Sequence, residues 1–215
     1  MITRAVITLI TNHRRPTGQY LIIMPNWCST SYAICSGDKQ LLQRICDAIN
    51  ECSSMVTPLI SKSCPNWTGN IFKKLELKGG QERTFWSDAK MEDGVLKFIE
   101  NSAWSRGMAI LSLQEYYISE DDIDFDVYFM SEEPGNGIWE TNDEEGLFFP
   151  ERYLLSGDDG CEYYNTFDEL VKEIQELLVV DTKFKNVAEI NVALDEAGDK
   201  IGCQQVHEIE IVNLE

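Results

Sequence analysis

Residues 123–130 read IDFDVYFM, and the pattern of this stretch decides the fold class. One set of alternate positions is Ile123, Phe125, Val127 and Phe129, and the other is Asp124, Asp126, Tyr128 and Met130. A period of two is that of a β-strand with one face on a core and the other in water, which is typical of antiparallel sheets. We therefore expect an antiparallel sheet here, with Asp124 and Asp126 pointing outward.

Helical periodicity appears on both sides of this strand. Apolar stripes with helical spacing predict helices at about 38–52, 106–117 and 166–180. Asp38 is a suitable N-cap for the first helix, and Thr166 with Glu169 forms a capping box for the third. These signals place helices between strands rather than in a separate bundle.

The remaining segments complete an α+β pattern. Strands are expected at 27–35 and 147–155, a hairpin at 84–104, a loop at 53–70, and a final hairpin from 188–194 and a strand ending at Val212. This order predicts a ferredoxin-like split βαβ arrangement, a mainly antiparallel sheet with helices on one face. It assigns 24–145 to that domain and 146–215 to a C-terminal β-α-β-β extension of the same or a closely packed unit.

The first 23 residues differ from the rest in charge. They contain Arg4, Arg14 and Arg15 and no acid, which gives them a net charge of +3. The remaining residues 24–215 carry −22, and the sum is the net charge of −19. Two interpretations stay open: an upstream extension before Met24, or a first hairpin of the fold.

Acidic residues dominate the middle of the chain. Between Glu115 and Glu162 there are sixteen Asp and Glu and one base, Arg152. Such a segment repels nucleic-acid phosphates and anionic membranes, and it favours basic protein surfaces. No apolar run approaches the ~20 residues that span a bilayer. The expected partner is thus a basic protein, without direct binding of nucleic acid or membrane.

The cysteine pattern indicates free thiols. Seven cysteines is an odd number, no export signal is recognised, and no CxxC occurs. Free thiols of this kind fit a reducing cytoplasm, and the spacings are not those of zinc ligands. No metal site and no cofactor is predicted.

One turn gathers the candidate binding residues. Glu132 and Glu133 precede Pro134-Gly135, and Trp139 and Glu140 follow it. With Trp104 they predict an aromatic, acid-lined groove for a peptide or small ligand. Asp124 and Asp126 complete the candidate set as outward charges on the strand, and the sequence identifies no catalytic residue.

Three segments resemble a known family. They are MPNWCSTSYAICSGDKQLL at 24–42, FIENSAWS at 98–105 and MSEEPGNGIWE at 130–140. In sequence and spacing they are similar to the YubB-type ferredoxin-like domain family of phage and other mobile-element proteins. The resemblance implies a fold and a mobile-element context rather than a reaction, and "ferredoxin-like" here names a topology without an iron–sulfur cluster.

Two functions are carried forward. The first is a non-enzymatic acidic interaction protein of mobile-element origin that binds a basic protein surface, for example by imitating nucleic acid. The alternative is a small-ligand or peptide-binding module, or a cryptic enzyme, with its cleft near the Glu-Pro-Gly turn. One continuous acidic face favours the first, whereas an acid-lined concave pocket with an aromatic floor favours the second. The oligomeric state stays open.

Overall fold

The computed structural model describes residues 27–80, 82–103, 106–121, 123–157, 160–198, 201 and 204–214. The predictions for 1–23 and for Trp104 lie outside these residues. Helices and strands alternate in the order β1 (Trp27–Cys35), α1 (Lys39–Ser53), α2 (Thr68–Lys74), β2 (Thr84–Glu92), β3 (Val95–Ala103), α3 (Ala109–Asp121), β4 (Asp126–Glu133), η1 (Pro134–Asn136), β5 (Ile138–Thr141), β6 (Tyr153–Gly157), β7 (Gly160–Tyr164), α4 (Phe167–Leu178), α5 (Val187–Ala197), β8 (Gln204–Glu208) and β9 (Glu210–Ile211).

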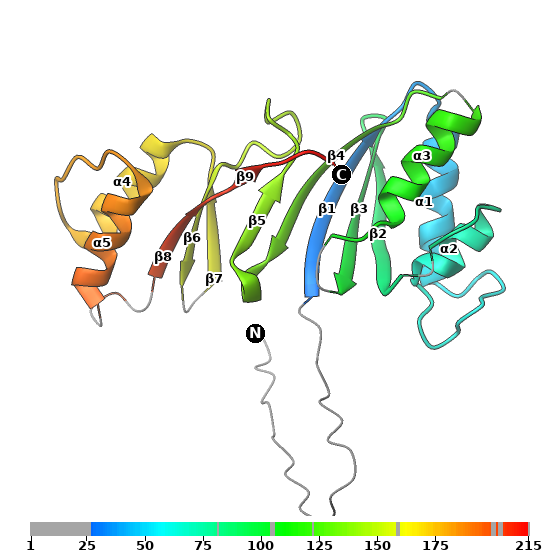
Figure 1. Ribbon diagram of the computed structural model, residues 1–215, viewed down its shortest axis with the longest axis horizontal. Helices are drawn as coiled ribbons and strands as arrows, with labels where there is room; N and C mark the ends of the chain where they lie inside the picture. The colour runs from blue at the N-terminus through cyan, green and yellow to red at the C-terminus, as the bar shows by residue number, and fades with distance from the viewer. Residues whose placement is uncertain are drawn as a thin grey trace, which may run out of the picture.

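The larger sheet confirms the predicted α+β class. Its strand order is β2-β3-β1-β4-β5-β9 (Figure 1), and every neighbouring pair is antiparallel except β5 with β9. Strand β3 lies between β1 and β2, and β1 lies between β3 and β4. Strands β1 and β2 are therefore separated by β3, and strands β3 and β4 by β1. Among the described residues, no helix combines the length and apolar character needed to cross a membrane.

Helices α1, α2 and α3 cover one face of this sheet, which we call the helix face (Figure 1). The main core lies between them and includes Tyr32, Phe98 and Phe129 from the strands. Asp38 begins α1 as predicted, because its carboxylate accepts the backbone N–H groups of Gln40 and Leu41. The opposite surface of the sheet is called the open face.

The alternation predicted for 123–130 is confirmed in part: β4 begins only at Asp126, and Met130, expected on the outer face, is buried in a small third core cluster. Phe125, Val127 and Phe129 are buried in the main core, whereas Asp124 and Asp126 are exposed. The strand follows the predicted faces because a shift by one residue would expose three large apolar side chains.

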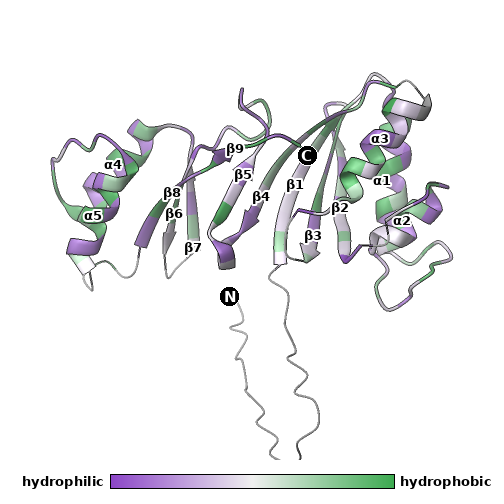
Figure 2. Cartoon of the chain, viewed as in Figure 1, coloured by the Kyte–Doolittle hydropathy of each residue, from purple (hydrophilic) through white to green (hydrophobic). Residues whose placement is uncertain are grey.

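The C-terminal part has a smaller sheet of order β7-β6-β8. Helices α4 and α5 pack on it through a second core that includes Leu170, Ile174 and Leu194. Figure 2 shows hydrophobic and hydrophilic positions alternating along both helices, as expected where one side of a helix is buried. Strand β9 then returns to the larger sheet beside β5, so the two sheets are connected through β8 and β9.

The prediction of a strand at 188–194 is wrong, because this segment lies in helix α5. The predicted C-terminal order β-α-β-β is thereby replaced by two strands, two helices and two strands. Asn186 caps the helix, and Ile190 and Leu194, one turn apart, are both buried. The same residues also alternate apolar and polar, but Val192 is 59% exposed, which a half-buried strand would not allow.

Three smaller predictions also differ. The expected loop at 53–70 ends inside α2, where the Asn70 side chain bonds to backbone groups of the preceding loop. The helix predicted at 106–117 is α3, and it starts at Ala109 rather than at 106. The strand expected at 147–155 begins only at Tyr153, because the backbone before it is bonded to the carboxylate of Asp143.

Candidate functional site

The predicted site residues occupy different places along β4. Asp126 is the first residue of the strand and Asp124 precedes it, whereas Glu132 and Glu133 lie at its end, next to the turn. Because the strand spans eight residues, the two pairs are separated by most of its length. Asp124 and Asp126 are therefore exposed surface charges away from the predicted groove.

Glu132 and Glu133 do not line one groove, which corrects that prediction. Neighbouring residues of a strand point to opposite faces. Glu132 lies on the open face, opposite Trp139 in the β4–β5 register, and accepts a hydrogen bond from Tyr163 that contributes to raising the pKa of this tyrosine, after the larger effect of burial. Glu133 lies on the helix face and is 1% exposed.

Glu133 is held among buried polar groups. Its Oε1 accepts a 2.6 Å hydrogen bond from Asn136, whereas its Oε2 is buried and has no hydrogen-bond partner among the described residues. Nearby, the Cys28 sulfur and the Ser131 hydroxyl lie 2.9 Å apart. Burial raises the pKa of the Cys28 thiol, and the charge of Glu133 adds to this effect. Cys28 is thus a neutral thiol and a poor nucleophile.

Glu140 also belongs to the helix face, where it forms a 2.6 Å ion pair with Arg106. The guanidinium carbon of Arg106 lies 4.1 Å from the centre of the Phe129 ring. Arg106 therefore connects the segment before α3 to β4 and β5 by charge and by a cation–π contact.

The buried polar residues of the helix face form a row across neighbouring strands. Thr30 of β1 pairs in register with Glu100 of β3 and Ser131 of β4. Glu100 accepts the backbone N–H of Gly107 at 2.7 Å and the indole N–H of Trp86 at 2.8 Å. Although burial raises the pKa of Glu100, these donors oppose the rise. The row therefore stabilises the sheet.

The concave site lies on the open side of the turn, beside Trp139. This cleft of about 530 Å³, the Trp139 cleft, is lined by residues of β5, the start of α5 and β8, namely Gly137, Ile138, Trp139, Asn186, Val187, Ala188, Val206, His207, Glu208 and Glu210. The ring centres of Trp139 and His207 are 4.0 Å apart at 34°. The indole N–H of Trp139 is buried and has no acceptor among the described residues.

The floor of the cleft is neutral and its rim is acidic. Burial lowers the pKa of His207, so the imidazole is uncharged at neutral pH. His207 Nε2 lies 3.2 Å from the hydroxyl of Ser156, which fixes the ring. Glu208 and Glu210 are exposed, and the described lining residues include no Lys or Arg. The arrangement suits a ligand with an apolar part and a positive charge.

Sequence patterns indicated only one wall of this cleft. Trp139 belongs to the predicted set, whereas the start of α5 does not, because the apolar positions of 188–194 also fit a strand. His207 is not among the predicted site residues either. A local signal for the helix existed in Asn186, which lies three residues before Glu189 and accepts its backbone N–H.

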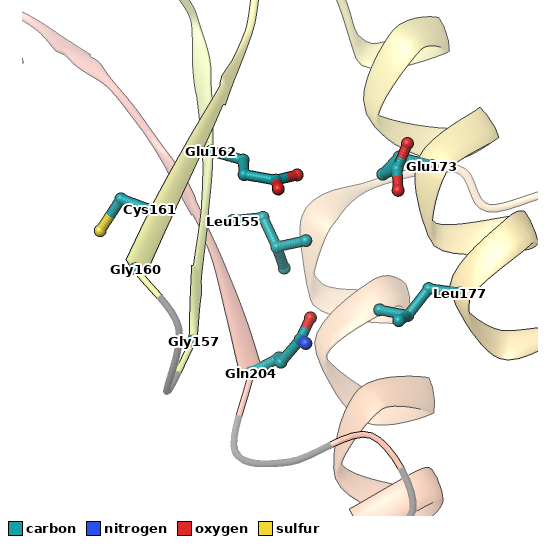
Figure 3. Close-up of a pocket in the computed structure, with 8 residues that line it drawn as sticks. All are labelled: Leu155, Gly157, Gly160, Cys161, Glu162, Glu173, Leu177 and Gln204. Atoms are coloured by element: carbon teal, nitrogen blue, oxygen red, sulfur yellow. The ribbon is translucent and has the colours of Figure 1, made fainter. Parts of the chain in front are cut away.

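A smaller cavity of about 260 Å³ lies between the β6–β7 hairpin and α4. Figure 3 shows Leu155 and Leu177 within it, with Glu162 and Glu173 at its edge and the sulfur of Cys161 directed away. It offers no buried charge and no aromatic floor, so it is a weaker candidate.

Metal and thiol chemistry receive no geometric support within the described part of the chain. It contains no group of three or more His, Cys, Asp or Glu placed to hold a metal ion. The six described cysteines are free, and Cys203 lies outside the described residues.

No family model matches the chain, and neither a curated protein nor a solved structure matches it.

Proposed function

We propose that this protein is a non-enzymatic binding protein that takes a basic segment of another protein into the Trp139 cleft. The supporting observation is the cleft itself, which has an aromatic floor, apolar walls and an acidic rim without a base. This combines the acidic interaction protein and the peptide-binding module that the sequence left as alternatives. The mobile-element origin rests on the resemblance alone.

Each part of a basic side chain has a counterpart in the cleft. The methylene groups of Lys or Arg pack on Ile138 and Val187, as long side chains do on apolar surface. The charged end reaches Glu208 and Glu210 at the rim.

Long-range electrostatics support the same partner. The net charge of −19 attracts a basic protein and speeds its association, and it opposes the approach of nucleic acid. A basic nucleic-acid-binding protein fits this description, and the proposal requires only an accessible basic segment.

The test uses the full chain and a fluorescently labelled peptide rich in Lys and Arg. In the double variant Glu208→Gln with Glu210→Gln we expect binding to weaken about 10-fold, since rim charges contribute roughly 0.2–1 kcal/mol each and their loss also slows association. A control variant, Asp195→Asn with Glu196→Gln, removes the same charge from the exposed far end of α5.

The dissociation constant is measured by fluorescence anisotropy at low and high salt. The control variant should bind like the unmodified protein, and an acidic peptide of equal length should not bind. Equal weakening in the two double variants would mean that the peptide responds to net charge alone, which would refute the cleft as the binding site.

A further inference from the structure

Two lysines lie directly opposite each other on the open face of the larger sheet. Lys90 of β2 pairs in register with Lys97 of β3. Like charges in this position destabilise a sheet, because the side chains of directly opposed residues lie next to each other. The pair is conspicuous in a chain with 18 bases and 37 acids.

A single carboxylate lies between the two ammonium groups. Glu92 is 2.6 Å from Lys90 Nζ and 3.0 Å from Lys97 Nζ. The hydrogen bonds to both lysines lower the pKa of Glu92. All three side chains are partly exposed, so a carboxylate from solution can take the place of Glu92 without a change in the backbone.

A β-bulge produces this opposition. The β2–β3 register shifts between Ser87 and Lys90, and Asp88 within the shift has a positive φ of 56°. This conformation is strained for a residue other than glycine. Bulges of this kind redirect side chains, and here the one in β2 places Lys90 opposite Lys97.

A groove of about 360 Å³ has both lysines in its lining. We call it the Lys97 groove; beside Lys90, Lys97 and Asp88 it is lined by Ser31, Tyr32, Ala33, Phe98, Ile99, Phe148 and Phe149. The Phe148 ring lies 4.9 Å from that of Tyr128, and Phe149 packs against the core cluster that contains Trp139. The lining of the groove thus combines two lysines and Asp88 with the aromatic side chains of Phe148 and Phe149.

We propose that the Lys97 groove binds a small amphipathic anion, an aromatic or aliphatic carboxylate. The carboxylate of the ligand replaces that of Glu92 between Lys90 and Lys97, and the apolar body lies against Phe148 and Phe149. Charge complementarity carries this assignment, because the lining has two cations, Lys90 and Lys97, against one carboxylate, Asp88, which accepts a hydrogen bond from Ser87. The site is separate from the Trp139 cleft, and its ligand has the opposite charge.

The experiment compares two probes of one shape and opposite charge, 2-naphthoate and 2-naphthylmethylammonium, by isothermal titration calorimetry on the full chain. Naphthoate should bind, and the ammonium probe should bind at least about 10-fold more weakly. Lys97→Gln should weaken naphthoate about 10-fold, whereas Glu92→Gln should strengthen it about 3-fold, because the competing carboxylate is gone.

The matched control is Lys172→Gln, which removes one lysine and its ion pair with Glu176 from an exposed site on α4. This variant should bind naphthoate like the unmodified protein. Equal binding of both probes, the same loss in Lys172→Gln as in Lys97→Gln, or weaker binding in Glu92→Gln would each overturn the proposal. The opposite signs expected for Lys97→Gln and Glu92→Gln exclude unfolding as the common cause.

Discussion

Replacement of Asp143 by Asn tests how the loop between β5 and β6 is held. Asp143 is 1% exposed, and its carboxylate accepts three backbone N–H groups, from Leu147 at 3.0 Å, Phe148 at 2.6 Å and Phe149 at 2.9 Å. Burial alone would raise the pKa of Asp143, but these bonds, with the charge of Arg152, outweigh it and lower the pKa. The charged carboxylate is therefore the stabilising form.

The size of the effect follows from the bonds. A hydrogen bond to a charged group contributes about 1.5–3 kcal/mol and a neutral one about 0.5–1.5 kcal/mol. Asparagine presents one oxygen, so its better orientation keeps the bonds to Phe148 and Phe149 in neutral form and loses the bond to Leu147. We expect Asp143→Asn to lower the free energy of unfolding by about 3 kcal/mol, because the loop relaxes in part toward water.

The pH dependence has a definite sign. Because the pKa of Asp143 is lower in the folded than in the unfolded protein, its stabilisation is present at neutral pH and is lost as the pH falls through the folded-state pKa. The difference between the unmodified protein and Asp143→Asn should therefore narrow in acid.

Urea unfolding at neutral pH and near about pH 3 measures both effects. Glu144→Gln, at the exposed neighbouring position, is the control and should change stability by less than about 0.5 kcal/mol. A loss below about 0.5 kcal/mol for Asp143→Asn at neutral pH, or a difference that does not narrow in acid, would refute the role of the carboxylate. Since this loop also carries Phe148 and Phe149, the same variant should weaken naphthoate in the Lys97 groove.

Three further predictions concern α5, the thiols and the surface charge. In urea unfolding, Ile190→Ala should lower the free energy of unfolding by about 2–4 kcal/mol and Val192→Ala by less than about 0.5 kcal/mol, because only Ile190 faces the second core. Similar losses in the two variants would support a strand in place of α5. Under native conditions Cys161, which is exposed, should react with iodoacetamide while buried Cys28 does not, as mass spectrometry of the labelled peptides will show; rapid labelling of Cys28 would contradict its burial. The melting temperature should rise with sodium chloride, since salt screens the repulsion among the sixteen acids of 115–162, and a flat response would mean that these carboxylates are dispersed or paired.

Elements with strong local signals were predictable from the sequence. Helix α1 has both an apolar stripe and the Asp38 cap, and α4 has the Thr166 capping box, which the structure contains. In β4, the alternation of exposed Asp126 with buried Val127 and Phe129 agrees with the predicted faces. In each case periodicity and capping chemistry indicate the same structure, so no tertiary information is needed.

Prediction failed where two periods fit the same residues. In 188–194 the apolar positions match a strand and also match a helix with Ile190 and Leu194 on one face. Packing against the second core decides for the helix, and that core consists of residues distant in sequence. The prediction of a groove at the turn is wrong for a different reason. Glu132 and Glu133 are neighbours in sequence, but neighbouring residues of a strand point to opposite faces.

The segments that carry the family resemblance converge in the larger sheet. Cys28 and Thr30 from the first segment, Glu100 from the second, and Ser131 and Glu140 from the third lie on adjacent strands of the helix face. Cys28 and Thr30 lie within hydrogen-bond distance of Ser131, and Glu140 pairs with Arg106. Glu100 accepts hydrogen bonds from Trp86, Tyr32 and Gly107. These contacts hold the strands and the segment before α3 together.

The Trp139 cleft takes most of its lining from elsewhere. His207, Glu208 and Glu210 come from the last strands, and Asn186 begins α5, all outside the three similar segments. If the scaffold is shared and the cleft is particular to this chain, substitutions in the polar row should reduce stability and leave the affinity of the folded fraction for the basic peptide unchanged. Substitutions at Glu208 and Glu210 should weaken the binding of the basic peptide and leave the stability unchanged. Thr30→Val, which removes a hydroxyl 3.0 Å from Ser131, is the variant that makes this comparison. If Thr30→Val weakens peptide binding while the protein stays folded, the scaffold and the site are not separable.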